Sequence, residues 1–218
     1  MKQTGKKKFS TFNTDNFHSL CNKLTKKDKD LHAIVSEFGH PPVWTRKASF
    51  QTLIHIILEQ QVSLASARAA LNKLKEKHGR ITPKKILSLS DSQLKACYFS
   101  RQKIIYARCL AEAILTRQIK LKDLSDFEDA EIRDRLKKIK GIGDWTVDVF
   151  LLFSLQRTNV FPIGDLAMVK AFKEIKRLSK ETKPEELSRL AENWAPYRSI
   201  ATMLLWHYYI QKKNLKVK

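Results

Sequence analysis

The chain has 218 residues, with 42 Lys and Arg against 22 Asp and Glu, which gives a formal net charge of +20 at pH 7. A chain of this length can bury a substantial core, in one compact domain or in two small lobes. So strong a positive charge favours a polyanion as partner, either a nucleic acid or an anionic membrane, because each neutralised phosphate releases a bound counterion. A lysine-rich surface that is merely well solvated is the alternative interpretation.

The cysteine and histidine patterns argue against several classes of protein. Cys21, Cys97 and Cys109 are odd in number and widely spaced, which disfavours a disulfide framework and a four-cysteine metal site. The six histidines have no metal-ligand spacing. No apolar run approaches the roughly 20 residues that span a membrane, and the basic N-terminus lacks the apolar segment of a signal peptide. We therefore expect an intracellular protein without a membrane partner, cytoplasmic or nucleoid-associated in a bacterium and nuclear in a eukaryote.

Apolar residues recur with helical spacing along nearly the whole chain, which has only six glycines and six prolines. The sequence therefore predicts an all-α fold of about ten helices. Residues 1–12 are expected to form a disordered basic tail, and residues 13–218 two helical lobes with a cleft between them. The predicted helices lie, in chain order, at 15–39 (one or two helices), 49–60, 63–79, from Thr82-Pro83, from Asp91, at 101–116, 131–138, 144–154, after Asp165, near Pro184 and at 197–212. Ser125 and Glu128 have the spacing of a capping box, and residues 159–162 are expected to be extended.

The segment Gly141-Ile142-Gly143 separates two predicted helices, so residues 131–154 are expected to form a helical hairpin. Glycine permits the tight turn, and helix amides that face outward attract phosphate. A pair of glycines at this spacing also occurs as a plain helix C-cap. The hairpin is thus a candidate phosphate-binding element.

A single carboxylate follows the hairpin, because Asp165 lies 20 residues after Trp145 and directly after Pro162-Ile163-Gly164. Its position before an apolar-periodic helix predicts an N-cap. A carboxylate fixed in this way is also suited to stabilise a developing positive charge. Combined with a phosphate-binding hairpin, it suggests chemistry on a nucleic acid.

These segments resemble the helix-hairpin-helix DNA glycosylases, and most closely their alkylated-base branch, the bacterial 3-methyladenine DNA glycosylase II and its fungal counterparts. The matching residues are Gly141, Ile142, Gly143, Trp145, Thr146, Phe161 and Asp165. Two further segments fit the same branch, residues 57–63 (Ile-Leu-Glu-Gln-Gln-Val-Ser) and 196–199 (Pro-Tyr-Arg-Ser), the second followed by Ala201, Leu205 and Trp206. The resemblance covers roughly residues 41–209.

The resemblance implies that Asp165 is the catalytic residue, stabilising an oxocarbenium-like sugar and either orienting or deprotonating the attacking water. Trp145 lies where bifunctional relatives place a lysine that attacks the sugar, and an indole cannot form a Schiff base. The resemblance thus implies a monofunctional glycosylase that flips an alkylated purine out of the duplex and hydrolyses its N-glycosidic bond in base excision repair.

By the same resemblance, Trp145, Tyr197 and Val149 line the base pocket, where an aromatic face would attract a cationic alkylpurine. Val149 stands where a relative carries tyrosine, which makes the pocket less aromatic. Gln61 is the expected wedge that fills the stack after base flipping, the alternative being a helix C-cap or turn residue. The alternative for Trp145 is a position in the core and not in the base pocket. Trp206 is expected to be a core residue.

The resemblance assigns DNA binding to the hairpin residues Lys140, Gly141, Ile142, Gly143 and Thr146. It also implies a monovalent cation, sodium or potassium, held by the main-chain carbonyls of Lys137, Ile139 and Ile142, with no other cofactor required. Lys103 and Tyr106 belong to a recurrent segment of the family and are expected to be structural. The expected partner is double-stranded DNA with alkylated bases, bound by a monomer.

Two other functions stay open at this stage. One is a glycosylase for uracil, oxidised or mismatched bases, which the tryptophan at position 145 and the lack of cysteines after Cys109 disfavour for most subclasses. The other is a catalytically silent protein that binds DNA lesions. Asp165 argues against it, because a pure binder gains nothing from a carboxylate that faces DNA.

Overall fold

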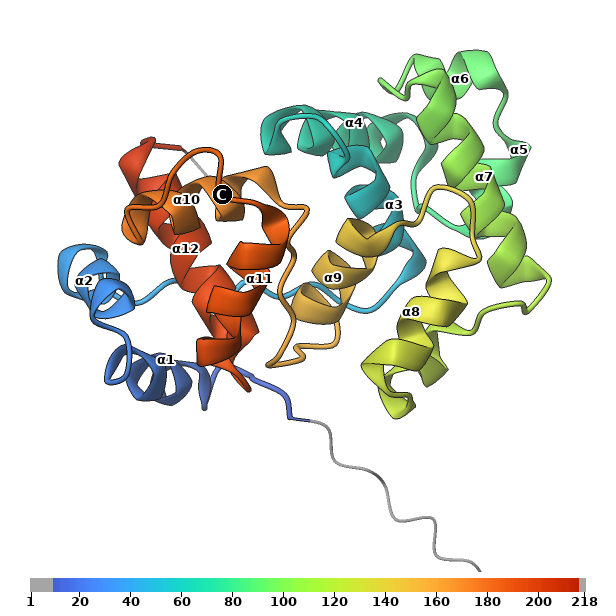
Figure 1. The fold of residues 1–218 in the computed structure, drawn as a ribbon. Helices are drawn as coiled ribbons and strands as arrows, with labels where there is room; N and C mark the ends of the chain where they lie inside the picture. Colours follow the sequence, from blue (N-terminus) through green and yellow to red (C-terminus); the bar gives the residue numbers. More distant parts are fainter. Residues whose placement is uncertain (1–9, 216–218) are drawn as a thin grey trace, which may run out of the picture. The chain divides into compact units, whose positions relative to one another are not determined.

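The computed structural model describes residues 10–215, which form twelve α-helices, two short 3-10 helices and one isolated β-bridge (Figure 1). The predicted all-α class is confirmed. The chain divides into two compact units, one formed by Arg46–Phe150 and the other by the described parts of Lys8–Thr45 and Leu151–Lys218. No helix in the described range combines the length and apolar character needed to cross a membrane.

The first unit contains helices that begin at Ser or Thr caps. Its elements are α3 (Phe50–Glu59), α4 (Leu64–His78), α5 (Pro83–Ser88), α6 (Asp91–Lys95), α7 (Arg101–Leu115), the 3-10 helix η1 (Leu121–Asp126), α8 (Asp129–Lys137) and most of α9 (Asp144–Phe153). The capping side chains, which accept a backbone N–H three residues ahead, are Ser49, Ser63, Thr82, Ser90 and Ser100. These caps satisfy amides that a helix start leaves without a partner. The predicted helix starts at Thr82-Pro83 and Asp91 are confirmed.

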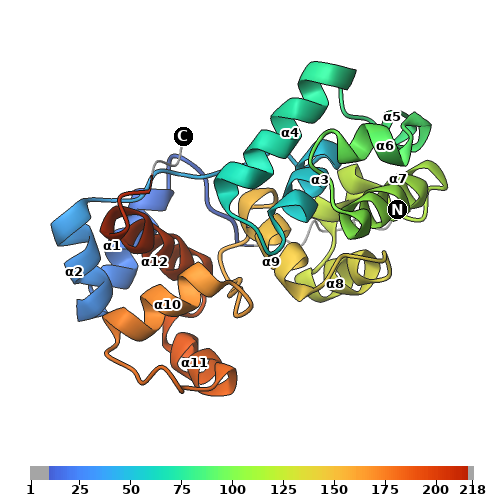
Figure 2. The ribbon, with the colours of Figure 1, turned by 90° about the horizontal axis from the view of Figure 1, so that it is seen from above.

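The second unit is built around the C-terminal helix. Its elements are α1 (Phe17–Thr25), α2 (Lys29–Phe38), the end of α9, α10 (Leu166–Ile175), α11 (Pro184–Ala191), the 3-10 helix η2 (Glu192–Trp194) and α12 (Arg198–Lys212). Helix α12 is buried on all sides from Ser199 to Tyr208 and packs on α10, α2 and α1 (Figure 2). Because it is buried all round, and most of its buried side chains are apolar, α12 lies at the centre of this unit's core.

The first described residues are not a disordered tail. Phe12 is 1% exposed, its N–H donates to the Gln156 carbonyl at 2.9 Å, and Thr11 forms a β-bridge with Arg157. The Phe12 ring also packs against the Phe17 ring, with the ring centroids 5.6 Å apart. The predicted tail is therefore wrong for residues 10–12, because a large apolar side chain gains more from burial than from solvation. Residues 1–9 lie outside the described range.

The predicted capping box at Ser125 and Glu128 is also wrong. Helix α8 begins at Asp129 with Glu128 as its N-cap residue, and Ser125 lies inside η1. The buried Leu124 anchors this 3-10 turn, which places Ser125 too early in the chain to cap α8. A capping box occurs instead at α6, where Ser90 and Gln93 bond reciprocally.

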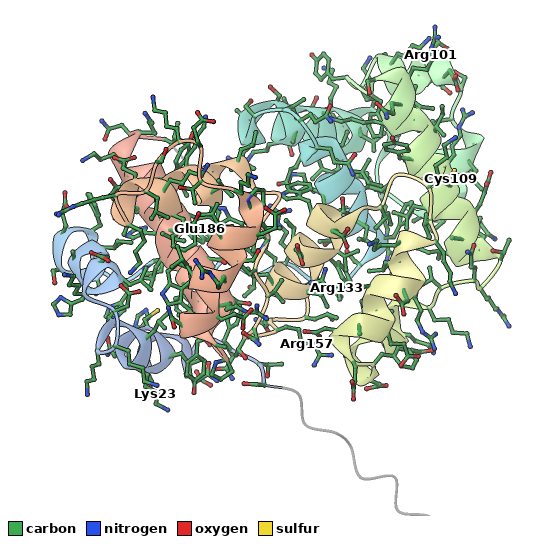
Figure 3. The ribbon with its side chains drawn as sticks, in the orientation of Figure 1. Lys23, Arg101, Cys109, Arg133, Arg157 and Glu186 are labelled. Carbon is green, nitrogen blue, oxygen red and sulfur yellow. The ribbon has the colours of Figure 1, made fainter. Side chains whose placement is uncertain are left out.

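The three cysteines are free thiols. Cys21 and Cys97 are buried, and Cys109 lies half-buried on α7 (Figure 3). Burial raises the pKa of the Cys21 thiol to about 12, so this side chain behaves as a small apolar residue at neutral pH.

A cluster of charges fastens α2 to the end of α10. The Lys176 ammonium donates to both Asp28 oxygens at 2.8 and 2.7 Å and to Asp30 at 2.8 Å. The Trp194 indole donates to Asp28 Oδ2 at 2.7 Å, and Asp28 is the N-cap of α2. Burial by itself raises the pKa of Asp28, but the hydrogen bonds from Lys176 and Trp194 outweigh it and lower that pKa below its ordinary value.

This cluster predicts a loss of stability in acid. Because the pKa of Asp28 is lower in the folded chain, its stabilisation is complete above about pH 4 and is lost as the pH falls through the folded value. We expect Asp28→Asn to lower the free energy of unfolding by about 2 kcal/mol at pH 7, the scale of a hydrogen bond to a charged group. Urea unfolding of both proteins from pH 7 to pH 2 should show a shallower acid dependence for the variant. Identical pH profiles would contradict the assignment.

Candidate functional site

The two glycines of the hairpin between α8 and α9 have different roles, Gly141 in the turn and Gly143 in the space before α9. Gly141 has φ of +92°, and a Cβ added there would overlap the Tyr106 side chain. A Cβ at Gly143 would meet nothing within 4 Å, and its φ is outside the left-handed region. Gly141 therefore makes the turn, while Gly143 leaves space in front of the first turn of α9. The helices at Asp129–Lys137 and Asp144–Phe153 confirm the predicted hairpin.

A glutamine at the C-terminal cap of α3 braces the hairpin. The Gln60 side-chain amide donates to the Gly141 carbonyl at 2.9 Å and to Thr146 Oγ1 at 3.0 Å. Thr146 is only 1% exposed, so its hydroxyl holds the start of α9 in place and is not offered to a phosphate. Sequence reasoning attached function to the neighbouring Gln61 and missed this brace. Two adjacent glutamines carry no signal that tells which one turns inward.

Two residues of α7 support the same region. Lys103 donates through Nζ to the Leu58 carbonyl near the end of α3, at 2.7 Å, and burial lowers the pKa of this lysine. Tyr106 packs against Gly141. Both side chains hold the hairpin and the end of α3 together, which confirms their predicted structural role.

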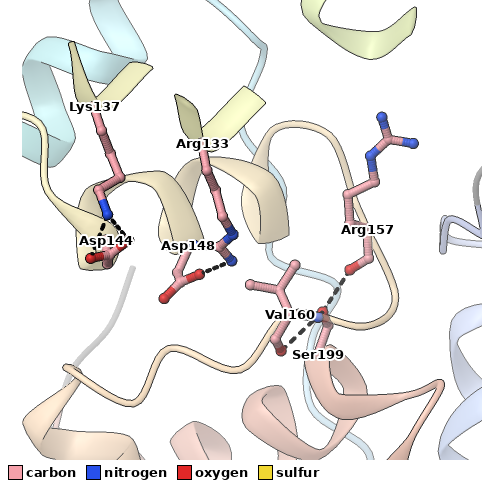
Figure 4. A network of polar contacts seen from close by, with 7 residues as sticks. All are labelled: Arg133, Lys137, Asp144, Asp148, Arg157, Val160 and Ser199. Carbon is pink, nitrogen blue, oxygen red and sulfur yellow. Dashed lines mark hydrogen bonds and ion pairs between the residues drawn. The ribbon is translucent and has the colours of Figure 1, made fainter. Parts of the chain in front are cut away.

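The three lysines of the hairpin are not equivalent. Lys137 donates to both oxygens of Asp144 at 2.7 and 2.9 Å (Figure 4). Lys138 and Lys140 are exposed, and neither forms an ion pair with an acidic residue of the described chain. Because Asp144 lies in the first turn of α9, its charge is also favoured by the positive end of the helix dipole. Lys138 and Lys140 therefore carry the positive charge of the hairpin that no described acidic residue neutralises.

Asp165 caps α10 in the second unit. Its Oδ1 accepts the Met168 N–H at 2.9 Å and the Trp206 indole N–H at 2.9 Å. Its own N–H donates to the Pro162 carbonyl at 2.8 Å. The predicted N-cap is confirmed, and the half-buried carboxylate is oriented by two donors from different elements.

Trp206 makes a contact with Asp165 that the sequence did not predict. It is 8% exposed and stacks on Phe153, with ring centroids 5.2 Å apart and an interplanar angle of 17°. Burial agrees with the expected core position, but the indole N–H also fixes Asp165. Its spacing on α12 is typical of a core residue, and nothing local connects it with a carboxylate 41 residues earlier.

The Pro-Tyr-Arg-Ser segment at residues 196–199 holds the chain that leads into Asp165. Ser199 Oγ donates to the Arg157 carbonyl at 2.6 Å and accepts the Val160 N–H at 2.9 Å (Figure 4). Arg198 Nε donates to Asn159 Oδ1 at 2.9 Å. The Ser199 hydroxyl thus gives the buried Val160 N–H a partner outside any helix, and the bonds from Ser199 and Arg198 hold the chain that leads to Asp165.

The profile of the HhH-GPD superfamily of base excision DNA repair proteins matches residues 54–196, a range that includes the hairpin and Asp165. The chain belongs to this superfamily. It is 33% identical over 187 residues to DNA-3-methyladenine glycosylase 1 of Schizosaccharomyces pombe, which covers 84% of this chain and 82% of the relative.

Two solved structures of DNA glycosylases have the same fold. One, of the S. pombe 3-methyladenine DNA glycosylase in complex with abasic DNA, superposes with a TM-score of 0.82 at 28% identity and covers 92% of this chain and 100% of that one. Another, of a Clostridium acetobutylicum 8-oxoguanine glycosylase/lyase in complex with double-stranded DNA, has a TM-score of 0.78 at 18% identity and covers 93% of this chain and 77% of that one. The second likeness shows the fold alone.

The residues expected to meet the flipped base are divided between the two units. Trp145, Val149 and Gln61 belong to the first unit, and Tyr197 belongs to the second with Asp165. Trp145 and Tyr197 are half-buried, whereas Val149 is 2% exposed and packs as a core side chain. The base-pocket assignment of these residues stays a prediction.

Gln61 is exposed and has a left-handed backbone conformation. It lies between α3 and α4, is exposed, and has φ of +57°. This left-handed conformation costs a non-glycine residue about 1–2 kcal/mol. The neighbouring Val62 and Leu64 are 45% and 47% exposed, so apolar side chains flank the amide. Tyr98, Arg117, Gln156, Arg177 and Asn214 also have positive φ, so the backbone alone does not single out Gln61, and its role as the wedge stays a prediction.

The monovalent cation that the family resemblance implies would be held by main-chain oxygens of the hairpin. Ile139 and Ile142 are buried, and the Ile139 carbonyl accepts the Ile142 N–H at 3.0 Å, which leaves that oxygen a second lone pair for an ion. Carbonyl oxygens suit hard cations. The donor chemistry therefore fits, and the cation stays a prediction. No group of three or more His, Cys, Asp or Glu side chains suited to a metal occurs in the described residues.

Proposed function

We propose that this chain is a monofunctional DNA glycosylase that flips an alkylated purine, of the 3-methyladenine type, out of double-stranded DNA and hydrolyses its N-glycosidic bond in base excision repair. The observation that carries the proposal is the Asp165 carboxylate, held by two N–H donors at the start of α10. The name of the S. pombe relative, at 33% identity, supports the substrate class. The protein acts as a monomer.

Asp165 performs the chemistry through its charge. Cleavage of the N-glycosidic bond builds positive charge on the deoxyribose in an oxocarbenium-like transition state. A carboxylate already oriented by Met168 and Trp206 stabilises that charge without having to reorganise. Orientation or deprotonation of the attacking water is the second task open to the same carboxylate.

The hairpin holds the DNA backbone. The amides at the start of α9 face a phosphate across the space left by Gly143, and Lys138 and Lys140 add positive potential. Contacts of this kind read no base, so they bind every sequence alike. The brace from Gln60 keeps this surface in shape before DNA arrives.

The base is selected by aromatic faces. A cationic alkylpurine is attracted to Trp145 and Tyr197 more strongly than a neutral base, because cation–π attraction adds to stacking. Gln61 enters the stack that the base has left. Alkylation also makes the purine a better leaving group, so the Asp165 carboxylate needs no partner that protonates the base.

Borohydride trapping tests the monofunctional assignment. Because Trp145 stands in place of a lysine nucleophile, turnover of an alkylated duplex should leave no protein–DNA adduct after reduction. Incubation of the protein with duplexes that carry uracil, an oxidised base or a mismatch should release little free base. A strong adduct that disappears on mutation of one lysine, such as Lys140 or Lys170, would make the enzyme bifunctional and overturn the assignment.

The variant Trp206→Phe tests whether the indole N–H positions the Asp165 carboxylate for catalysis. Phenylalanine keeps a ring against Phe153 but removes the N–H that holds Asp165 Oδ1. We expect single-turnover base release to slow by about tenfold, since a misoriented catalytic group loses part of its effect, while duplex affinity stays within twofold. A folded variant with a normal rate would show that the indole is only a core residue.

A further inference from the structure

A basic pocket lies in the first unit, where the start of α3 meets the end of α4 and the chain before α5. Its volume is about 710 Å³, which is within the range of small-molecule sites. The cationic or titratable side chains that line it are Arg46, Lys47, His55, Lys75 and Arg80. None of its lining residues, all from the described chain, is acidic.

Most of this positive charge is available to a ligand. Lys47, Lys75 and Arg80 are exposed and form no ion pair with the described acidic residues. Arg46 is bonded through both terminal nitrogens to Glu59, at 2.8 and 2.7 Å. The pocket therefore concentrates positive potential within a concave wall, which strengthens its attraction for an anion.

The floor of the pocket is rigid. Ser49 Oγ accepts the Thr52 N–H at 3.2 Å, and Thr52 Oγ1 donates to the Lys47 carbonyl at 2.6 Å. These bonds fix the chain at the start of α3, whose first turn carries the positive end of the helix dipole. A prearranged site loses less conformational entropy when a ligand binds.

The pKa of His55 depends on the charges that surround the pocket. Its Nε2 atom is buried without a hydrogen-bond partner and lies 3.6 Å from Glu59 Oε1. Burial lowers the pKa of His55; Glu59 raises it, and Arg46, Lys75 and Arg68 lower it further. Negative charge placed among these cations would raise that pKa.

We propose that this pocket binds the phosphate groups of a phosphate-bearing anion, at a site separate from the hairpin. The pocket lies at the start of α3, whereas Gln60, which braces the hairpin, follows its other end. The lining residues of α3 end at His55, which at 1.5 Å per residue is about 7.5 Å along the helix axis from Gln60. The volume accommodates at least two linked phosphates, so the source is either a free pyrophosphate or nucleotide, or the phosphates of a DNA strand. The proposal does not depend on the glycosylase activity.

Titration calorimetry with inorganic pyrophosphate at low salt tests the proposal. The pocket variant is Lys47→Gln with Lys75→Gln, and the matched control is Lys95→Gln with Lys122→Gln, which removes the same charge from exposed positions of the same unit away from the pocket. We expect a dissociation constant below 1 mM for the wild type, at least about tenfold weaker binding by the pocket variant and less than twofold change in the control. No binding, or equal weakening in both variants, would overturn the proposal.

Two further measurements complete the test. Pyrophosphate should shift the imidazole resonances of His55 and raise its pKa, and an unchanged His55 signal would count against the pocket even if heat is released elsewhere. Duplex DNA distinguishes the two sources. If the DNA backbone occupies the pocket, pyrophosphate competes with duplex and the pocket variant binds duplex more weakly than the control does; if a free ligand occupies it, both variants bind duplex equally.

Discussion

Asp165→Asn is expected to slow the release of an alkylated base by at least about 10²-fold, in line with the loss of a positioned charged catalyst. Asparagine keeps an acceptor oxygen for the Met168 and Trp206 N–H groups, so the cap of α10 and the fold should survive. Only the charge that faces the developing cation is removed. Duplex affinity should stay similar or rise slightly, because a negative charge near phosphates is lost.

The chain offers a matched control for this variant. Asp28 is also a helix N-cap in the second unit, and it also accepts an indole N–H, from Trp194. Asp28→Asn should therefore lower stability and leave base release normal at a temperature where the variant is folded. Single-turnover excision and equilibrium binding for both variants separate the two effects. Near-normal excision by a folded Asp165→Asn protein would show that the carboxylate is only a cap.

The second large effect is expected at Gly141. Gly141→Ala combines a left-handed backbone with overlap between the new Cβ and Tyr106, and it should lower the free energy of unfolding by about 2–4 kcal/mol. Duplex binding should fall with it, because the amides of the hairpin lose their arrangement. Thermal and urea unfolding, with duplex binding at constant salt, measure both consequences.

Gly143→Val is the matched comparison two residues away. A Cβ at Gly143 meets open space, so the change in stability should be below about 1 kcal/mol. The side chain nevertheless occupies the room in front of the α9 amides, and duplex affinity should fall by about tenfold for every sequence alike. Normal binding by Gly143→Val would place the phosphate elsewhere on the protein.

Local signals explain why the hairpin and the cap could be predicted. A glycine in a tight turn and an aspartate before an apolar helix both depend on their sequence neighbours alone. The turn at Gly141 and the helix cap at Asp165 can therefore be predicted from the sequence. The functional meaning of both came from resemblance to a family. Neither residue by itself distinguishes a glycosylase from another helical protein.

Long-range contacts explain what could not be predicted. Gln60 reaches partners 81 and 86 residues later in the chain, and Trp206 reaches Asp165 across 41. No spacing rule connects such pairs. Tertiary packing also overrode two local patterns, since burial of Phe12 orders the chain from residue 10 and the η1 turn removes Ser125 from the start of α8.

The central claim is hydrolysis of an N-glycosidic bond, and it is tested most directly by the stoichiometry of products from a methylated duplex. In a single turnover with excess protein, free methylated purine and abasic sites should appear together in equal amounts, with the strand left intact until alkali is added. Duplex that is bound but releases no free base would contradict the account and favour a silent lesion-binding protein.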